Sequence, residues 1–455
     1  MGKPVSKVRE AKLELYRKKG KIHAKASAGR FTTLRWAMVW LTQLIFFGTC
    51  WLSWDTGGVA RQAVLLDIAH EKLYLFGLVL WPQDALLMAF VLILAATALF
   101  FVTALAGRLF CGFACPQTVY TSIFTWIEAK VEGDHLDRLK LDQAPLGPRK
   151  LALKATKHGL WLLFSAWTGI TFVGYFTPIR ELLASLPSWS VGPWEAFWLL
   201  FYGAFTYVQA GLAREAVCQH MCPYSRFQGV MFDPTTRNVA YDARRGEPRS
   251  AGRPSGNGGD CIDCGICVQV CPTGIDIRDG LQYQCINCGV CIDACDQVMT
   301  RIGSPTGLIR FAPEQTAPAP WHRRPRVLTY ALLLLAFAAL GVWTLSQRSL
   351  LRVDILRDRN VLARETADGR IENAYQLQVM NLSEAAQHYQ VSLDGESPLE
   401  IVGERSITVD AGSILPLQLT LSAGAEALPP GSHPVVFHVV SGTMQARESS
   451  TFRMP

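Results

Sequence analysis

The chain has 455 residues and a formal net charge of +7, with 50% hydrophobic and 18% charged residues. So few charges are unusual for a soluble enzyme, and the length exceeds what one small domain needs, so two or three structural units are expected. The positive charge collects in a few connecting segments. It therefore gives no reason to expect a nucleic-acid partner.

Residues 1–35 form a basic N-terminal segment that includes the cluster Arg17, Lys18, Lys19 and Lys21. Beyond it lie five apolar stretches, each close to the roughly 20 residues that cross a bilayer as a helix. They are residues 36–54, 85–107, 160–179, 196–213 and 327–345. One such stretch could be a buried core helix, but five together predict an integral membrane protein. The first has no small-residue cleavage site and is interpreted as a membrane anchor.

Lysine and arginine are unevenly distributed among the segments that connect these stretches. Residues 1–35 carry eleven, 108–159 carry eight and 214–326 carry thirteen, whereas 55–84 carry two and 180–195 carry one. Cytoplasmic segments of membrane proteins are enriched in these two residues. The N-terminus and residues 214–326 are therefore predicted to be cytoplasmic, and residues 346–455 are predicted to lie on the outer side.

Two of the apolar stretches are followed by the same cysteine pattern. GRLFCGFACPQTVYT follows the second and CQHMCPYSRFQGVMFD follows the fourth, and both contain C-x3-C-P. Cysteines four residues apart share one helix face, and the proline disfavours helical geometry at the cysteine before it. We expect the four thiols to meet at the inner membrane surface; they are Cys111, Cys115, Cys218 and Cys222.

Soft thiolates favour Cu(I), zinc or iron–sulfur clusters. The four thiols could bind Cu(II) and hold the ion after its reduction, carry a third redox centre, or cycle between dithiol and disulfide. They could also be small buried side chains without a chemical role. Because the pattern occurs twice at equivalent positions, a chemical role is favoured, and we expect these thiols to bind copper.

Residues 237–260 are a Gly/Pro/Arg-rich linker, and residues 261–300 carry two cysteine quartets. Each quartet has the C-x2-C-x2-C-x3-C spacing of bacterial two-cluster ferredoxins, in which the fourth cysteine binds the other cluster. Zinc sites usually use two well-separated C-x2-C pairs, so zinc and disulfides are poor alternatives. One [4Fe–4S] cluster is assigned to Cys261, Cys264, Cys267 and Cys295, and the second to Cys271, Cys285, Cys288 and Cys291.

The C-terminal part of the chain changes character. Residues 301–326 form a second linker, residues 327–345 are the fifth apolar stretch, and residues 346–455 alternate apolar and polar side chains between Gly/Pro/Ser turns. That alternation predicts a small antiparallel β-sandwich. It has no cysteine for a blue-copper site. Its His388, His433, His438 and Met444 are interpreted as surface residues rather than metal ligands.

None of the five apolar stretches has a histidine in its interior, so a transmembrane haem pair has no ligands. The chain also has no Rossmann fingerprint or phosphate-binding loop, which gives no indication of flavin or nicotinamide binding. Electrons are therefore expected to come from a separate cytoplasmic donor or from the quinone pool.

Four stretches together resemble one known family. RQAVLLDIAHEKLYLFGLVLWPQD, GRLFCGFACPQTVYT, CQHMCPYSRFQGVMFD and YDARRGEPR look like the FixG/RdxA/CcoG family of cytochrome c oxidase accessory proteins. The resemblance covers nearly the whole chain. It implies a multi-pass protein of the bacterial inner membrane with two [4Fe–4S] clusters and a periplasmic immunoglobulin-like domain. It further implies a role in assembling the cbb-type oxidase by reducing Cu(II) to Cu(I).

The predicted architecture is an α-helical membrane protein with an inserted two-cluster ferredoxin and a C-terminal immunoglobulin-like β-sandwich. A four-helix membrane region covers residues 36–236. The predicted activity is that of a cupric reductase, with copper as substrate or transient ligand and oxidase assembly proteins as partners. Two alternatives stay open: a quinol-linked electron conduit resembling the ferredoxin subunits of nitrate or nitrous-oxide respiration, and an oxidase assembly scaffold.

Overall fold

The computed structural model describes residues 21–56, 59–250, 258–313, 320–357, 363–394 and 398–455. Arg17, Lys18 and Lys19 of the predicted basic cluster lie outside these residues. The chain divides into two compact units: one comprises Met1–Cys50 with Ala95–Leu334, and the other Trp51–Leu94 with Leu335–Pro455. The membrane helices run through both units, the ferredoxin belongs to the first, and the β-sandwich to the second.

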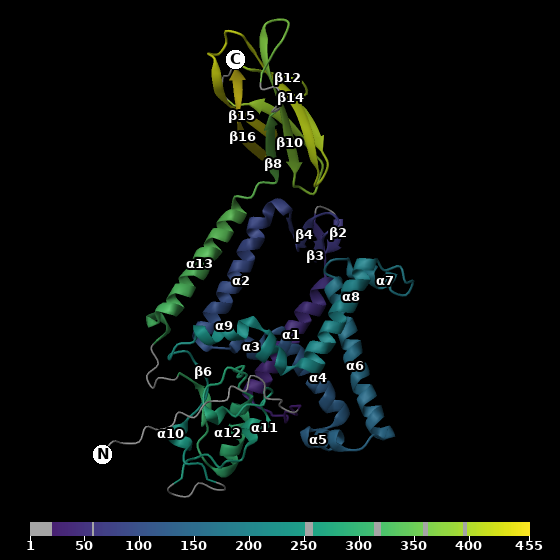
Figure 1. Cartoon of the computed structure of the whole chain (residues 1–455). Coiled ribbons are helices and arrows are strands. Elements are labelled where there is room, and N and C mark those ends of the chain that lie inside the picture. Colours follow the sequence, from purple (N-terminus) through teal and green to yellow (C-terminus); the bar gives the residue numbers. More distant parts are fainter. Residues whose placement is uncertain (1–20, 57–58, 251–257, 314–319, 358–362, 395–397) are drawn as a thin grey trace, which may run out of the picture. The chain divides into compact units, whose positions relative to one another are not determined.

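A helix covers most of each predicted membrane stretch (Figure 1). These helices are α1 (Arg30–Gly48), α2 (Ala85–Ala106), α6 (Pro148–Val173), α8 (Pro193–Thr206), which continues into the π-helix η3 (Tyr207–Ala213), and α13 (Pro325–Ser346). Three segments are long and apolar enough to cross a membrane among the residues described: Pro82–Ala106, Pro193–Ala213 and Pro325–Ser346. The length and hydropathy of these three segments indicate a membrane protein.

The first and third predicted spans differ from the helices that contain them. Helix α1 begins at Arg30 and ends at Gly48, so residues 49–54 of the first span lie beyond it. Helix α6 begins at Pro148 and ends at Val173, so its first half carries Lys154 and Lys157 and its apolar part is short. The prediction of five membrane spans is therefore not confirmed, and the crossing of α1 and α6 stays a prediction.

Short helices follow the two C-x3-C-P motifs at the ends of α2 and η3. The first cysteine of each motif lies within a short helix: α3 (Leu109–Phe113) contains Cys111, and the π-helix η4 (Val217–Met221) contains Cys218. After the motifs come α4 (Pro116–Glu132) and α5 (His135–Gln143) in the first case, and α9 (Pro223–Met231) in the second. Cys115 and Cys222 have extended backbone angles, with ψ of 129° and 111°, and the proline after each opens a new helix. This is the helix break that the proline predicts.

The ferredoxin contains more of the chain than the predicted residues 261–300. Its helices are α11 (Ile266–Gln269), η5 (Ile277–Asp279) and α12 (Val290–Ile302). Strand β6 (Asn238–Tyr241), which lies in the predicted linker, pairs antiparallel with β7 (Ile309–Ala312). Because both strands contribute buried side chains to the same core as the cysteines, the fold begins before and ends after the cysteine motifs.

The first turn of α1 is held in place by the ferredoxin. The carboxylate of Asp293 in α12 accepts hydrogen bonds from the backbone N–H groups of Phe31 (3.1 Å) and Thr32 (2.7 Å) and from the Thr32 hydroxyl (2.9 Å). These donors belong to the first turn of α1, which has no other side-chain cap at Gly29. A residue 262 positions away along the chain thus performs the role of a helix N-cap.

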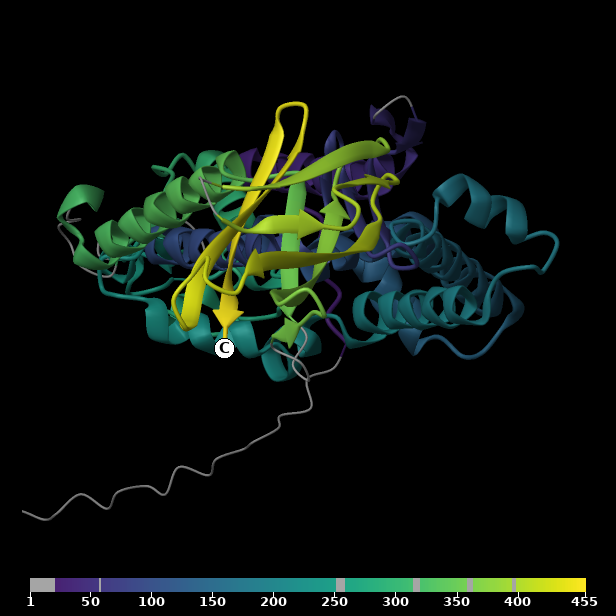
Figure 2. The same ribbon diagram turned by 90° about the horizontal axis from the view of Figure 1, so that it is seen from above.

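The second unit contains the C-terminal β-sandwich, drawn from green to yellow in Figures 1 and 2. One sheet has the strand order β12-β14-β10-β8 with β9 beside β10, and the other has the order β13-β11-β15-β16. Strand β10 pairs with β14 from Arg370↔Gly424 to Met380↔Ile414. The strands are β8 (Leu351–Arg357), β9 (Arg364–Glu365), β10 (Arg370–Asn381), β11 (Gln387–Leu393), β12 (Glu400–Val402), β13 (Ser406–Val409), β14 (Ile414–Gly424), β15 (Gly431–Ser441) and β16 (Met444–Met454).

The segment between α1 and α2 forms small sheets that pack on this sandwich. The strands are β1 (Ser53–Thr56), β2 (Val59–Gln62), β3 (Val64–Asp67), β4 (Lys72–Leu75) and β5 (Leu78–Leu80). Leu65, Tyr74, Val79 and Trp81 share one apolar cluster with Met380 and Leu382 of the sandwich. The sequence pattern gives no expectation of these strands. Short helices complete the described elements: η1 (Thr49–Trp51), η2 (Pro82–Asp84), α7 (Ile179–Ser185), α10 (Ala243–Gly246) and η6 (Trp321–Arg323).

Candidate metal centres

The eight ferredoxin cysteines surround two cavities. The first cavity is lined by Cys261, Cys264, Cys267 and Cys295. The second is lined by Cys271, Cys285, Cys288 and Cys291, and Cys267 borders it as well. The remaining walls are largely apolar, with Ile262 and Leu308 in the first cavity and Ile275 and Ile286 in the second. The fourth cysteine of each motif therefore lies with the first three of the other.

The two motifs use the same backbone geometry. Asp263 and Gly265 in the first motif have φ of 51° and 64°, and Asn287 and Gly289 in the second have φ of 53° and 73°. Left-handed residues next to right-handed ones turn consecutive N–H groups toward one side of the chain, an arrangement that recurs at iron–sulfur sites. The donor set and the loops both fit two [4Fe–4S] clusters.

Burial affects the acidity of the ferredoxin thiols. Desolvation raises the pKa of Cys267 to about 11 and the pKa of Cys285 and Cys295 to about 12. Without a bound cation these side chains are protonated thiols at neutral pH. Loading with iron must therefore release protons, because only the thiolate is a ligand.

The structure also brings together the four thiols of the C-x3-C-P motifs. Cys111 lies in α3, Cys115 precedes α4, Cys218 lies in η4 and Cys222 precedes α9. Cys111 interacts electrostatically with Cys115 and Cys218, and Cys218 interacts with Cys115 and Cys222. Burial is the main cause that raises the pKa of Cys111 to about 12 and that of Cys218 to about 11.

No three His, Cys, Asp or Glu side chains lie close enough to hold one metal ion between them, as far as the described residues extend. This applies both to the thiol quartet (Cys111, Cys115, Cys218 and Cys222) and to the ferredoxin cysteines. In a cluster site the irons and sulfides stand between the ligands, so the thiols need not approach one another as closely as around a single ion.

The thiol quartet adjoins the second ferredoxin cavity. Cys111 packs against the apolar cluster that contains Ile286 and Cys288. At Gly112 a Cβ would lie only 2.6 Å from the Ile286 carbonyl oxygen and 2.9 Å from the Cys288 Cα. Only glycine permits so close an approach of two backbones. The Arg108 guanidinium joins the segments further, because it donates to the carbonyl oxygens of Tyr283 and Ser225.

Comparisons with known proteins agree with this arrangement. Residues 213–314 match a family described as a 4Fe-4S dicluster domain, residues 88–132 match a 4Fe-4S binding domain, and residues 341–455 match the IG-like fold at the C-terminal of FixG. The protein RdxB of Cereibacter sphaeroides is 37% identical over 430 residues, which cover 90% of each chain. The nitrogen fixation protein FixG of Rhizobium meliloti is 34% identical over 463 residues, covering 89% of this chain and 87% of that one. The chain belongs to the FixG and RdxA family.

This FixG-family member is therefore an iron–sulfur electron-transfer protein of a membrane. A part of it is also similar to a protein of another name. The methylamine utilization ferredoxin-type protein MauN of Paracoccus denitrificans is 27% identical over 177 residues, which cover 38% of this chain and 50% of that protein.

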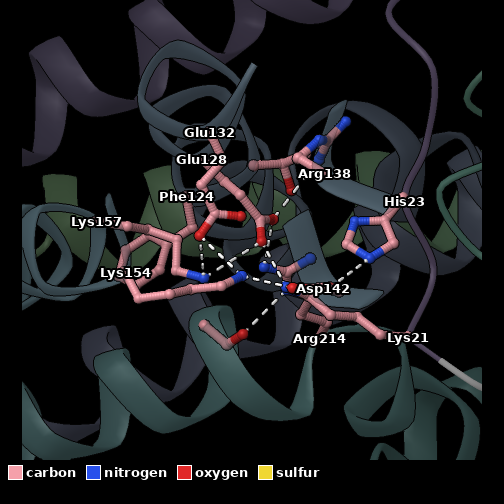
Figure 3. Close-up of polar contacts among 12 residues, drawn as sticks. Lys21, His23, Phe124, Glu128, Glu132, Arg138, Asp142, Lys154, Lys157 and Arg214 are labelled. Atoms are coloured by element: carbon pink, nitrogen blue, oxygen red, sulfur yellow. Dashed lines mark hydrogen bonds and ion pairs between the residues drawn. The ribbon is translucent and has the colours of Figure 1, made fainter. Parts of the chain in front are cut away.

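The FixG-family chain has a buried ionic network that the sequence analysis missed (Figure 3). At its centre is Glu128 of α4, whose side chain is 0% exposed. Its carboxylate contacts Lys21 Nζ (2.5 Å), Arg214 Nη2 (2.7 Å) and Lys157 Nζ (3.5 Å). Burial alone would raise the pKa of Glu128, but Arg214 and Lys21 hold the pKa of this carboxyl well below its usual range.

The network connects the two segments of the FixG-family protein that carry the C-x3-C-P motifs. Glu128 belongs to α4, which starts directly after Cys115, and Arg214 stands four residues before Cys218. Arg214 has a left-handed φ of 44°, which is uncommon for a residue with a long side chain. Its carbonyl accepts a hydrogen bond of 2.9 Å from the Gln117 side chain. These contacts fix the second thiol pair relative to the first.

Arg108 and Gln228 are further site residues that the sequence analysis missed. Arg108 follows an apolar stretch and is one of several basic residues there, so the sequence offers no special signal for it. Gln228 lies in α9 and accepts a hydrogen bond of 3.3 Å from the Cys111 thiol. Only the tertiary structure shows that both side chains contact the thiol-bearing segments.

Proposed function

We propose that this protein is a cupric reductase that supplies Cu(I) for the copper centre of a cbb-type cytochrome oxidase. In the overall reaction each Cu(II) takes up one electron and becomes Cu(I). The electrons come from a cytoplasmic donor or from quinol, which is oxidised and can supply two electrons for two copper ions. The similarity to FixG and the IG-like domain support membership of this family of iron–sulfur electron-transfer proteins. The copper specificity is the proposal.

The eight ferredoxin cysteines are the proposed cluster ligands, divided between the two cavities as their linings suggest. [4Fe–4S] clusters bound there supply one-electron chemistry. The largely apolar walls reduce the access of water and oxidants to bound clusters, most of all in the second cavity, because Cys264 of the first cavity is exposed. Cys271 and Cys295 each connect one motif to the opposite cavity. Loss of either ligand is therefore expected to weaken both sites.

One observation carries the proposal more than any other. The thiol-bearing helix α3 touches the cysteine loop of the second ferredoxin cavity at Gly112, and Cys111 packs against the same loop. A redox-active ferredoxin that only needed a membrane anchor would not require four half-buried thiols, one of them at this contact. The thiol quartet is therefore proposed as the place where electrons leave the ferredoxin for copper.

The test uses the purified full-length protein under anaerobic conditions. The protein is reduced with dithionite, freed of excess reductant and mixed with one equivalent of Cu(II). The expected results are oxidation of the iron–sulfur chromophore and formation of Cu(I), detected with a Cu(I)-specific chelator. Cys50→Ser is the matched control, because Cys50 is a buried thiol in a separate apolar cluster with Val173 and Ile179.

The variant to compare is Cys115→Ser with Cys222→Ser. We expect it to keep the ferredoxin absorbance and to lower the rate of copper reduction at least tenfold, whereas Cys50→Ser should match the wild type. Copper reduction at the wild-type rate by the double variant would remove the quartet from the proposed route. No copper reduction by the wild-type protein would refute the proposed activity itself.

A quinol-linked electron conduit is the second candidate. The similarity to MauN, which is named a ferredoxin-type protein, supports electron transfer in general, and the quinol as electron donor is the proposal. A conduit would oxidise a quinol analogue and pass the electrons to a protein acceptor. Quinol oxidation that continues without copper, together with slow copper reduction, would favour this candidate over the cupric reductase.

We also propose that the ferredoxin and the N-terminus are cytoplasmic and that the β-sandwich is periplasmic, in a bacterial inner membrane. The distribution of Lys and Arg supports this orientation. It places the iron–sulfur sites in a compartment where thiols stay reduced. It also leaves the β-sandwich available to oxidase assembly proteins on the other side.

A further inference from the structure

Two buried polar side chains beside the thiol quartet have hydrogen-bonding groups without a partner. Gln228 is 0% exposed, and its Nε2 has no acceptor among the described residues. Arg108 is 4% exposed, and its Nε likewise has no acceptor among them. A buried donor without an acceptor costs about 1–3 kcal/mol, so such groups usually mark the place of a missing partner.

The charge of Arg108 points to the same place. Its Nη1 and Nη2 donate to two backbone carbonyls, and none of the ion pairs found among the described residues pairs it with a carboxylate. The groups whose charge acts on it are thiols: Cys111, Cys285, Cys218 and Cys222. A buried cation needs a nearby negative charge. Three of these four thiols belong to the C-x3-C-P motifs, and the fourth, Cys285, lines the second ferredoxin cavity. Arg108 therefore stands between the thiol quartet and that cavity, where negative charge on either side would stabilise it.

The arrangement of the thiols matches a cluster better than a single ion. The four thiols interact with one another electrostatically, yet no three of them approach closely enough to share one ion. The two ferredoxin quartets, whose spacing is that of cluster ligands, behave in the same way. Iron–sulfur clusters held by thiolates carry negative charge, and N–H groups donate to their sulfur atoms.

The match to the 4Fe-4S binding domain leaves this ligand set incomplete. That match covers residues 88–132, and within it only Cys111 and Cys115 are cysteines. A [4Fe–4S] cluster normally requires four thiolates. Cys218 and Cys222, which the fold places beside the first pair, supply the missing two.

We propose that Cys111, Cys115, Cys218 and Cys222 are the ligands of a third [4Fe–4S] cluster, to which Arg108 and Gln228 donate hydrogen bonds. This inference deepens the proposed function and rests on it in one respect, namely that electrons leave the ferredoxin at the thiol quartet. Copper is then the acceptor of these electrons and is not itself held by the four thiols.

The first test is the iron and acid-labile sulfide content of the anaerobically purified full-length protein. We expect about twelve of each per chain, against about eight for the two ferredoxin clusters alone. Mössbauer spectra should assign all of the iron to cubane clusters. A wild-type protein that holds about eight iron atoms after reconstitution with iron and sulfide would overturn the proposal.

The second test assigns the additional iron to the quartet. Cys115→Ser with Cys222→Ser should lose about four iron atoms and keep the other eight, while the control Cys50→Ser keeps all twelve. Loss of iron from the ferredoxin instead, with the ferredoxin EPR signals gone, would contradict the assignment. If the double variant does not fold, the iron content of the wild-type protein still decides the question.

The third test concerns the two donors. Arg108→Gln removes the buried cation but keeps a hydrogen-bonding side chain, and Gln228→Met keeps the volume but removes the amide. Gln228→Met should lower the midpoint potential of the quartet's cluster alone, because the negative charge of that cluster loses stabilisation. Arg108→Gln should lower the same potential and also that of the second ferredoxin cluster, because Arg108 acts on Cys285 as well, and should leave the first ferredoxin cluster unchanged. Equal shifts of all three potentials, or none, would show that these side chains do not face the cluster.

The outcomes separate this inference from the proposed function. A protein with about twelve iron atoms that does not reduce copper would keep the third cluster and refute the cupric reductase. A protein with about eight iron atoms whose copper reduction depends on Cys115 and Cys222 would do the reverse.

Discussion

Replacing Glu128 with Gln should strongly destabilise the unit that contains the thiol quartet. The substitution keeps the shape of the side chain and removes its charge, which leaves Arg214 and Lys157 buried without their central carboxylate. The Arg214 and Glu128 side chains are only 8% and 0% exposed. Breaking a buried ion pair by removing one partner costs about 3–5 kcal/mol, and we expect a loss in that range.

The assay is chemical unfolding of the purified protein in detergent, followed by the near-UV signal of the tryptophans. The matched control is Glu400→Gln, which removes one partner of the Arg370–Glu400 pair (2.6 Å), whose side chains are 40% and 66% exposed. Exposed pairs contribute about 0–1 kcal/mol, so the control should unfold almost like the wild type. Equal and small losses in both variants would refute the view that the network stabilises the fold.

The pH dependence gives the same prediction a second measurement. The pKa of Glu128 is lower in the folded protein than its usual value, despite the opposing effect of burial. Its contribution to stability is therefore complete above the unfolded-state pKa of about 4.3 and is lost as the pH falls toward the folded-state pKa. Glu128→Gln should be less stable than the wild type at pH 7, and the difference should shrink in acid. A constant difference would exclude ionised Glu128 as the cause.

Three further predictions follow from other contacts. Gly112→Val should push α3 away from the Cys288 loop, since even a Cβ would lie 2.6 Å from the Ile286 oxygen. Stopped-flow measurements should then show at least tenfold slower copper reduction with the iron content unchanged. An unchanged rate would argue against this contact as the route of electron transfer. Asp293→Ala removes the cap of α1, which should cost about 1 kcal/mol and speed amide hydrogen exchange at Thr32; unchanged exchange there would contradict the cap. Reporter fusions at residue 280 should behave as cytoplasmic and fusions at residue 455 as exported, and the opposite pattern would overturn the proposed orientation.

Local patterns predicted the parts of the fold that local physics determines. The alternation of Tyr375, Leu377 and Val379 predicted a strand with one buried face, and all three side chains are buried in the sandwich core. Leu415 belongs to a similar alternating run, but it is exposed near the start of β14. Alternation predicts which residues share one face of a strand. Whether that face is buried at each position depends on whether the opposite sheet or another element packs against it there.

Spacing predicted the grouping of the cysteines because a cluster imposes a fixed local geometry on its ligands. The contacts that hold the groups together come from distant parts of the chain and leave no such pattern. Lys21 and Glu128 are 107 residues apart, and Arg108 and Tyr283 are 175 apart. A single arginine or glutamate in a sequence gives no indication of such a partner. The bounds of α1 and α6 differ from the predicted spans for a related reason, since hydropathy alone does not mark where a helix begins or ends.

The cap that Asp293 provides for α1 has a consequence for how the protein matures. The first turn of α1 is synthesised long before the residue that satisfies its N–H groups, so it must wait for the ferredoxin to be made and docked. Asp293 lies between Cys291 and Cys295 on α12, two residues from a cysteine of each cluster cavity. A ferredoxin that has not acquired its iron would leave α12 without the ligand bonds that hold it in place, and α1 would then lose its cap. The order of the amino end of the membrane region is thus expected to depend on cofactor loading in a domain more than 200 residues further along the chain.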